Sequence, residues 1–322
     1  MHTFQDFSGA CRLPWHTLML VFCFIPLAAF SQSDSSSRSP LMTSLYPEDQ
    51  GTPVVLRSLP RLHDTLSINP VRLSLAGSVV VGSLAIIHHY QERAWWLGPR
   101  SPLWFKNDPT YALNIDKLGH MYASYFLSQV FGYTLSWCGL DRHTSTVWGG
   151  GLAAGYQLFL EVEDGYRLNW GFDPVDAFAD IGGAAIPLLQ ESFPVLRNFS
   201  LKYSYFPSKS WKERNSGNGI FVDDYDGMTL WLSVDPHFLM GERLSGVVPS
   251  WLGFSLGYAV RNLDYSGKGN RVYYLTLDYN LSKIQTSSDL LIALFRAIDF
   301  IHLPAPGVRL EQGRMSLGIF YR

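Results

Sequence analysis

The chain has 322 residues, of which 25 are Lys or Arg and 27 are Asp or Glu, so 16% of the residues are charged. An ordinary soluble domain carries about 25% charged residues. The 15% aromatic content excludes intrinsic disorder, which requires few aromatics and a high net charge. A net charge of −2 without a run of Lys or Arg argues against a nucleic-acid-binding protein. The composition therefore points to a membrane or cell-envelope protein.

Residues 1–31 are predicted to be a secretory signal peptide. The uncharged run Thr17–Phe30 is followed by Ser31, and Ala29 and Ser31 occupy the small-residue positions of a cleavage site. A retained N-terminal anchor is the alternative. Cleavage would leave Cys138 as the single cysteine, which excludes an internal disulfide in the cleaved chain.

Four apolar segments predict a helical domain over residues 70–197, preceded by a tether and irregular segment at 32–69. The segments are Leu73–Ile87 (with flanks, Pro70 to Arg93), Leu118–Leu140, Thr144–Leu160 and Pro174–Leu189. The second has 23 residues without a charge, which is long enough to cross a bilayer. The third contains Gly151-x-x-x-Gly155, a spacing that lets helices approach closely in lipid. We predict a bundle of about four membrane-associated helices; a buried bundle in a soluble protein is the alternative.

The C-terminal region, residues 198–322, has a hydrophobic period of two, typical of antiparallel strands with one apolar face. The expected strands are Phe199–Tyr205, Met228–Val234, Leu252–Val260, Arg271–Leu281 and Met315–Tyr321. Asp289–Leu303 is predicted to be an amphipathic helix between the last two. The predicted fold class is therefore α+β, with an antiparallel sheet of five or six strands after the helices. We expect this sheet to pack on the helices or to lie against a membrane.

Ionisable residues gather near the ends of the apolar segments. They are Asp116, Lys117 and His120 in the second, Glu161 and Asp164 after the third, and Asp176 and Asp180 in the fourth. His120 and Asp180 lie inside apolar stretches, where an ionisable side chain is costly unless it is paired. Because the connections between the segments are short, these groups are predicted to meet in a buried Lys/His/Asp/Glu cluster.

The same residues also have structural interpretations. Asp173 before Pro174 is typical of a helix N-cap, and Asp176 would then lie in the first turn, where its charge complements the helix dipole. A buried ionic network is thus the alternative to a catalytic or ligand-binding site. In a catalytic site, His120 would be the acid or base, with Glu161 and Asp180 orienting it or holding a divalent metal.

Three motifs in order, D-K-x-x-H, E-x-x-D and W-x5-D-x3-D-x-G-G, resemble the YfiM-like family of predicted periplasmic lipoproteins, which is uncharacterised. More distantly they are similar to VanZ-like membrane proteins, linked with glycopeptide resistance. The matching positions are Asp116, Lys117, His120, Glu161, Asp164, Trp170, Asp176, Asp180, Gly182 and Gly183. The resemblance covers about residues 95–190. Two features depart from it: Cys23 follows Phe22, where a lipoprotein signal has a small residue, and Asp180 stands where VanZ-like proteins usually have Asn.

Two functions remain open from the sequence. The first is a non-enzymatic cell-envelope membrane protein with a structural or assembly role, whose partners are membrane lipid and an envelope protein. The alternative is a membrane-embedded hydrolase or transferase acting on a lipid-linked or cell-wall substrate through His120, Glu161 and Asp180. No G-x-S-x-G, Walker A or H-E-x-x-H motif is present. The last residues, 320–322 (FYR), favour the outer membrane for a protein secreted across the inner membrane.

Overall fold

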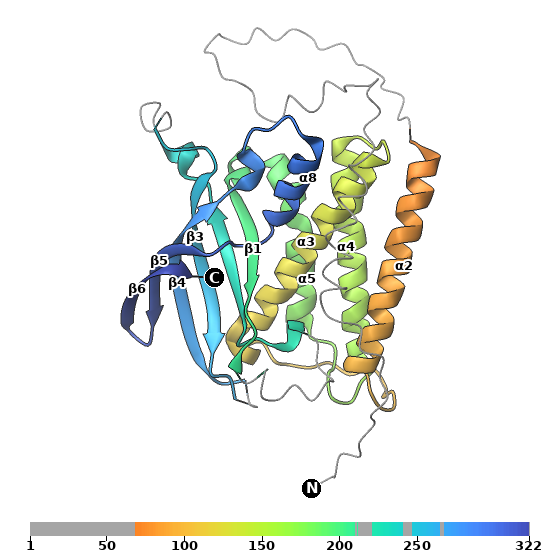
Figure 1. Cartoon of the computed structure of the whole chain (residues 1–322). Helices are drawn as coiled ribbons and strands as arrows, with labels where there is room; N and C mark the ends of the chain where they lie inside the picture. The colour runs from red at the N-terminus through yellow and green to blue at the C-terminus, as the bar shows by residue number, and fades with distance from the viewer. Residues whose placement is uncertain (1–67, 210, 212–220, 241–246, 265–266, 322) are drawn as a thin grey trace.

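The computed structural model describes residues 68–209, 211, 221–240, 247–264 and 267–321. The predicted signal peptide and nearly all of the predicted tether lie outside these residues. Within them, four long helices are followed by an antiparallel sheet, with one shorter helix inserted before the last two strands (Figure 1). The α+β class with helices preceding the sheet is therefore confirmed.

Each predicted apolar segment forms a helix. They are α2 (Pro70–Ala94), α3 (Ile115–Trp137), α4 (Arg142–Gly165) and α5 (Pro174–Ser192). In α2, α4 and α5 the first turn is capped by a side chain that accepts hydrogen bonds from backbone N–H groups: Asn69 caps α2 and Asp141 caps α4. Asp173 caps α5 with Pro174 in the first turn, as predicted.

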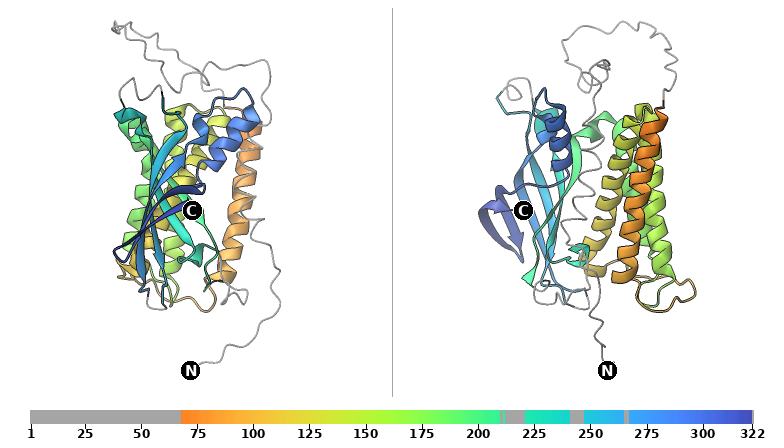
Figure 2. Two further views of the ribbon diagram at one scale, coloured as in Figure 1. Left: turned by 60° about the vertical axis from the view of Figure 1, so that its left-hand side comes forward. Right: turned by 45° about the vertical axis from the view of Figure 1, so that its right-hand side comes forward.

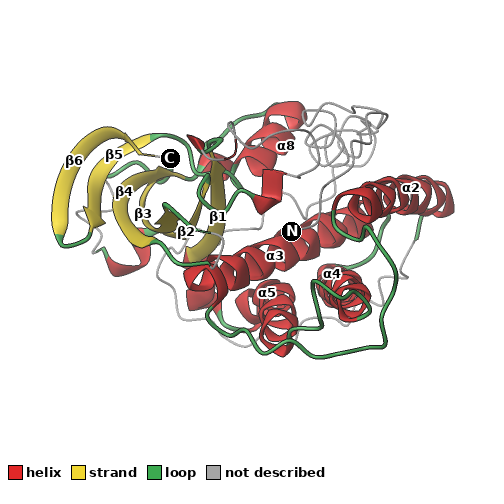
Figure 3. Ribbon diagram, turned by 90° about the horizontal axis from the view of Figure 1, so that it is seen from below, coloured by secondary structure: helices red, strands yellow, loops and turns green. Residues whose placement is uncertain are grey.

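The α3 helix lies between the sheet on one side and the pair α4 and α5 on the other (Figure 3). It meets α4 and α5 at glycines. A Cβ on Gly149 would lie 2.7 Å from the backbone nitrogen of Gly132, and one on Gly183 would lie 2.0 Å from the carbonyl oxygen of Met121. Only a residue without a side chain permits these two contacts.

The predicted close approach at Gly151-x-x-x-Gly155 is wrong. A Cβ on either glycine would have no atom within 4 Å outside its own chain segment. The rotation of α4 instead directs Gly149 and Gly150 toward the neighbouring helices, since a Cβ on Gly150 would lie 3.0 Å from the carbonyl oxygen of Ala184. The spacing of small residues indicated a contact helix but not which of its faces makes the contact.

The α2 helix lies at the edge of the bundle (Figure 1), and most of its apolar side chains are exposed. Val71 is 75% exposed and Val81 is 67% exposed. Among the described residues, α2 is the one helix that is long and apolar enough to cross a membrane. The prediction of four membrane helices is thus supported for this helix alone.

The sheet has six strands in sequential order, each antiparallel to its neighbour (Figure 2). The strands are β1 (Phe199–Tyr205), β2 (Met228–Val234), β3 (Leu252–Arg261), β4 (Asn270–Tyr279), β5 (Ala305–Glu311) and β6 (Arg314–Tyr321). The prediction missed β5, because Pro306 and Gly307 weaken its strand pattern. The predicted amphipathic helix is α8 (Asp289–Ile298), which ends before Leu303 because the chain there turns to pair with β1.

In β3–β6 the apolar face of the sheet is largely exposed, which is the reverse of the usual arrangement in a soluble antiparallel sheet. A row of leucines crosses the strands in register, and Leu232, Leu256 and Leu275 are direct neighbours in it. Leu256 is 48% exposed, and Leu317 on β6 is 83% exposed. On β1–β3 the same face packs against α3, where Leu230 contributes to a core with Ile115.

The opposite face of the sheet is buried and combines polar side chains with an apolar cluster of Trp231, Ala259, Val272 and Tyr274. Its buried polar members are Lys202, Ser204, Thr229, Ser233, Ser255, Thr276, Asp278 and Asn280. Lys202 and Asp278 form an ion pair of 2.9 Å, and the His302 ring stacks on Trp231 at 3.6 Å between ring centroids. The sheet therefore buries a face that is partly polar and leaves apolar side chains exposed on the other.

Candidate functional site

Lys117, in the first turn of α3, is surrounded by three carboxylates. Its Nζ lies 3.0 Å from Asp116, 2.9 Å from Asp173 and 2.9 Å from Asp176. All four side chains are buried. Because an ammonium group has three hydrogens, these three bonds use its full donor capacity. Lys117 thereby joins the first turn of α3 to the first turn of α5.

His120, one turn further along α3, contacts acidic groups from two other helices. Its Nδ1 lies 3.2 Å from Asp180 on α5 and 3.6 Å from Glu161 on α4. On the other side of the ring, Nε2 lies 3.9 Å from Asp116. The side chain of His120 is 28% exposed, whereas those of Glu161 and Asp180 are buried. The predicted trio therefore converges, with the imidazole as its accessible member.

Asp180 is held in place by neutral donors that the sequence analysis did not assign to it. Ser124 on α3 donates to Asp180 at 3.1 Å, and Gln157 on α4 donates at 3.2 Å. With His120, these contacts engage a carboxylate that is fully buried. Ser124 lies four residues after His120 and so on the same face of α3, whereas Gln157 comes from another helix and nothing in its local sequence marks it.

Asp164 belongs to the periphery of the cluster. Its carboxylate accepts a hydrogen bond from the indole of Trp96, and its backbone oxygen accepts one from Gly171. It thus anchors the loop that precedes α3 to the end of α4. Tyr225, which the sequence analysis did not select, donates to Asp116 at 2.6 Å from the segment leading into β2.

Burial and the charges of neighbouring side chains together set the protonation state of the two basic groups. Burial disfavours the charge of Lys117, but Asp116, Asp173 and Asp176 outweigh it and raise the pKa of the ammonium. The pKa of His120 is raised well above its usual value in the same way, mainly through Asp180 against the effect of burial. Both basic groups are therefore held in their protonated form.

The carboxyl groups divide into two kinds. Burial raises the pKa of Glu161 to about 8, with the His120 charge opposing it, and raises the pKa of Asp176 to about 6, with Asp116 adding to the shift. For Asp116, His120 and Lys117 outweigh burial and lower the pKa. Glu161 and His120 therefore both carry a proton at neutral pH. Protonated groups of this kind can donate a proton to a bound molecule.

Residues 103–192 match the family described as "Predicted periplasmic lipoprotein (DUF2279)". The match spans α3, α4 and α5 with all of the cluster residues named above except Tyr225 and Trp96. It confirms the resemblance to uncharacterised predicted periplasmic lipoproteins and indicates a location in the cell envelope. The similarity to VanZ-like proteins stays a hypothesis. No curated protein and no solved structure matches the chain.

Proposed function

We propose that this chain, like the family that its helical part resembles, works in the cell envelope, where it is a membrane-anchored protein with a structural or assembly role. Its partner in this proposal is membrane lipid, which contacts α2 and the outer face of the sheet. The observation that carries the proposal is the exposed apolar surface of these two elements, because soluble proteins rarely leave such surfaces uncovered.

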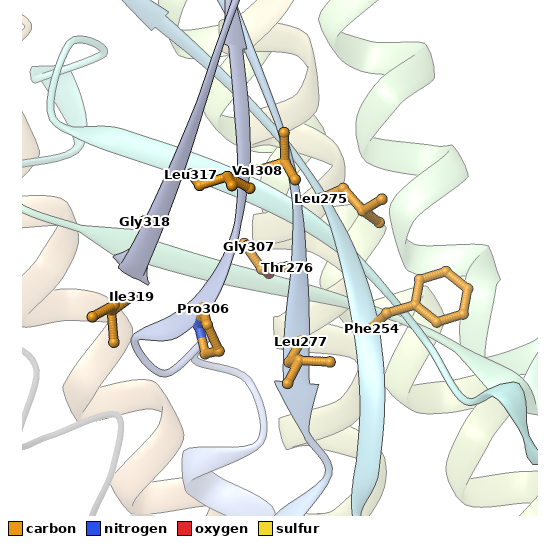
Figure 4. Close-up of a pocket in the computed structure, with 10 residues that line it drawn as sticks. All are labelled: Phe254, Leu275, Thr276, Leu277, Pro306, Gly307, Val308, Leu317, Gly318 and Ile319. Carbon is orange, nitrogen blue, oxygen red and sulfur yellow. The ribbon is translucent and has the colours of Figure 1, made fainter.

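The shape of the outer sheet face supports lipid as its partner. Between β3, β4, β5 and β6 lies an open groove of about 770 Å³ (Figure 4). Its side-chain walls are mainly apolar and include Phe254, Leu275, Leu277, Val308, Leu317 and Ile319. An antiparallel sheet in water normally buries its apolar face and exposes its polar one. The reverse arrangement suits a sheet whose outer neighbour is hydrocarbon.

The ionic cluster fits a structural role within this proposal. The Nζ of Lys117 donates three hydrogen bonds to carboxylates of α3 and α5. These bonds hold the N-terminal ends of the two helices together. Removing one member of a buried ionic group is strongly destabilising, since its partners keep an uncompensated buried charge. The cluster would hold the bundle against which β1–β3 pack.

Fractionation and cysteine labelling test the membrane contact. In a background without the native cysteines, we would place one cysteine at Val81 or Leu317, and one at Lys268 as an exposed polar control. A water-soluble maleimide should label the control in membranes, whereas the two apolar positions should react only after detergent treatment. Equal labelling of all three in membranes, or recovery of the protein in the soluble fraction, would contradict the proposal. A density gradient then tests our preference for the outer membrane.

A hydrolase or transferase acting on a lipid-linked or cell-wall substrate is the second candidate. The observation that favours it is the partly exposed imidazole of His120 beside the buried, protonated Glu161. Because both groups carry a proton at neutral pH, the pair could supply a general acid. The test compares His120→Asn with His143→Asn, which changes an exposed histidine on α4. Normal abundance with loss of product release from envelope lipid or cell-wall material, in the first variant only, would favour chemistry over scaffolding.

A further inference from the structure

We infer that Asp116, His120 and Asp176 form a binding site for one divalent transition-metal ion. Ligand atoms of these three side chains lie within 4.8 Å of one another. One imidazole nitrogen with carboxylate oxygens is a donor set that suits borderline ions such as Zn²⁺. The inference does not depend on the membrane contact proposed above.

An unpartnered oxygen points to a missing ligand at this place. Asp176 is only 6% exposed, and its Oδ1 has no hydrogen-bond partner among the described residues. Its other oxygen is taken by Lys117. A buried carboxylate oxygen without a partner is costly, and a bound cation would remove that cost.

The two ring nitrogens of His120 face different carboxylates. Nδ1 faces Asp180, which Ser124 and Gln157 fix in turn. A metal-bound histidine commonly donates its second N–H to a carboxylate in this manner, which orients the ring. Nε2, which lies 3.9 Å from Asp116, is then the nitrogen that would exchange its proton for the ion.

The charges around the site favour a further cation. Five acidic side chains surround Lys117 and His120; they are Asp116, Glu161, Asp173, Asp176 and Asp180. The partial exposure of His120 provides the side from which an ion could enter. Lys117 donates to Oδ2 of Asp116 and to Oδ2 of Asp176, so it would neighbour an ion bound at the Oδ1 atoms without replacing it. Asp116 Oδ1 also accepts the hydrogen bond from Tyr225 and would be shared between that hydroxyl and the ion.

Zinc titration of the full-length protein tests the inference. The protein, purified in detergent and stripped with a chelator, should bind one Zn²⁺ with a raised melting temperature. His120→Gln and Asp176→Asn should each weaken binding at least tenfold. Asp108→Asn is the control, because it removes a carboxylate from an ion pair outside the cluster, and it should bind Zn²⁺ as the wild type does.

Two outcomes would overturn the site: no stoichiometric binding by the wild type, or unchanged binding in folded Asp176→Asn. If Glu161→Gln then loses binding, the ion lies on the other side of His120. If a variant fails to fold, X-ray absorption of the Zn²⁺-loaded wild type identifies the ligands of the ion instead. One imidazole among oxygen ligands supports the assignment, whereas no imidazole or more than one contradicts it.

Discussion

His120 on α3 and Asp180 on α5 lie 3.2 Å apart, from Nδ1 to Oδ1, although 60 positions separate them in the chain. The distance follows from the absence of a side chain at Gly183, one turn beyond Asp180, which lets α5 rest against the backbone of Met121. The polar contact therefore depends on an apolar one, because the helices must touch before the charged groups can pair.

Replacement of Gly183 by Ala should separate these helices. The new methyl group would meet the carbonyl oxygen of Met121, so we expect a loss of about 1–3 kcal/mol in the free energy of unfolding. The adjacent Gly182→Ala is the control: its Cβ would have open space, and alanine favours a helix by up to about 1 kcal/mol. Chemical denaturation measures both, and equal effects would contradict the close contact at Gly183.

Lys117→Met should destabilise the protein by about 3–5 kcal/mol, because three buried carboxylates would lose their shared cation. Lys106→Met provides the comparison. Lys106 pairs with Asp108 at 3.2 Å in a more exposed setting, so its loss should cost no more than about 1 kcal/mol. The unfolding midpoint and cellular abundance report the difference. Similar stability of both variants would show that the buried cluster does not brace the helices.

Acid should weaken the sheet through His302. Burial lowers the pKa of this ring to about 4, although Asp278 opposes the shift, so the folded protein resists its protonation. The unfolded chain binds that proton near pH 6.5, and stability is therefore lost as the pH falls from 6.5 to 4. The wild type should lose up to about 3 kcal/mol more than His302→Gln over this interval. Parallel stability curves for the two proteins would refute the assignment.

Tyr225→Phe should cost about 1.5–3 kcal/mol, because the phenol donates to the buried, charged Asp116 at 2.6 Å. The phenyl ring would keep the edge contact with Tyr111. Tyr321→Phe is a suitable control, since its hydroxyl contacts the exposed Ser316 and its loss should change stability little. Urea denaturation compares the two. A small effect at Tyr225 would mean that this link between the sheet side and the bundle adds no stability.

The helices were predictable because an apolar run limited by capping residues such as Asp173 carries its own local signal. The cluster was predictable for a related reason: ionisable residues such as His120 and Asp180 inside apolar segments must find partners. The uncharged residues that contact the cluster were not predictable. Gln157 and Tyr225 are ordinary polar residues in their local context, and only the packing of other elements brings them to Asp180 and Asp116.

The amino-acid sequence alone determined the class of the protein, its helical segments, five of its six strands and the identity of the charged residues that meet. These features depend on hydrophobic period and on the cost of burying a lone charge, which act over a few turns of chain. Tertiary structure decided which glycines permit helix contact, which face of the sheet is enclosed and which oxygen of Asp176 lacks a partner. Each of these depends on the rotation of one element against another, and many distant side chains set that rotation together.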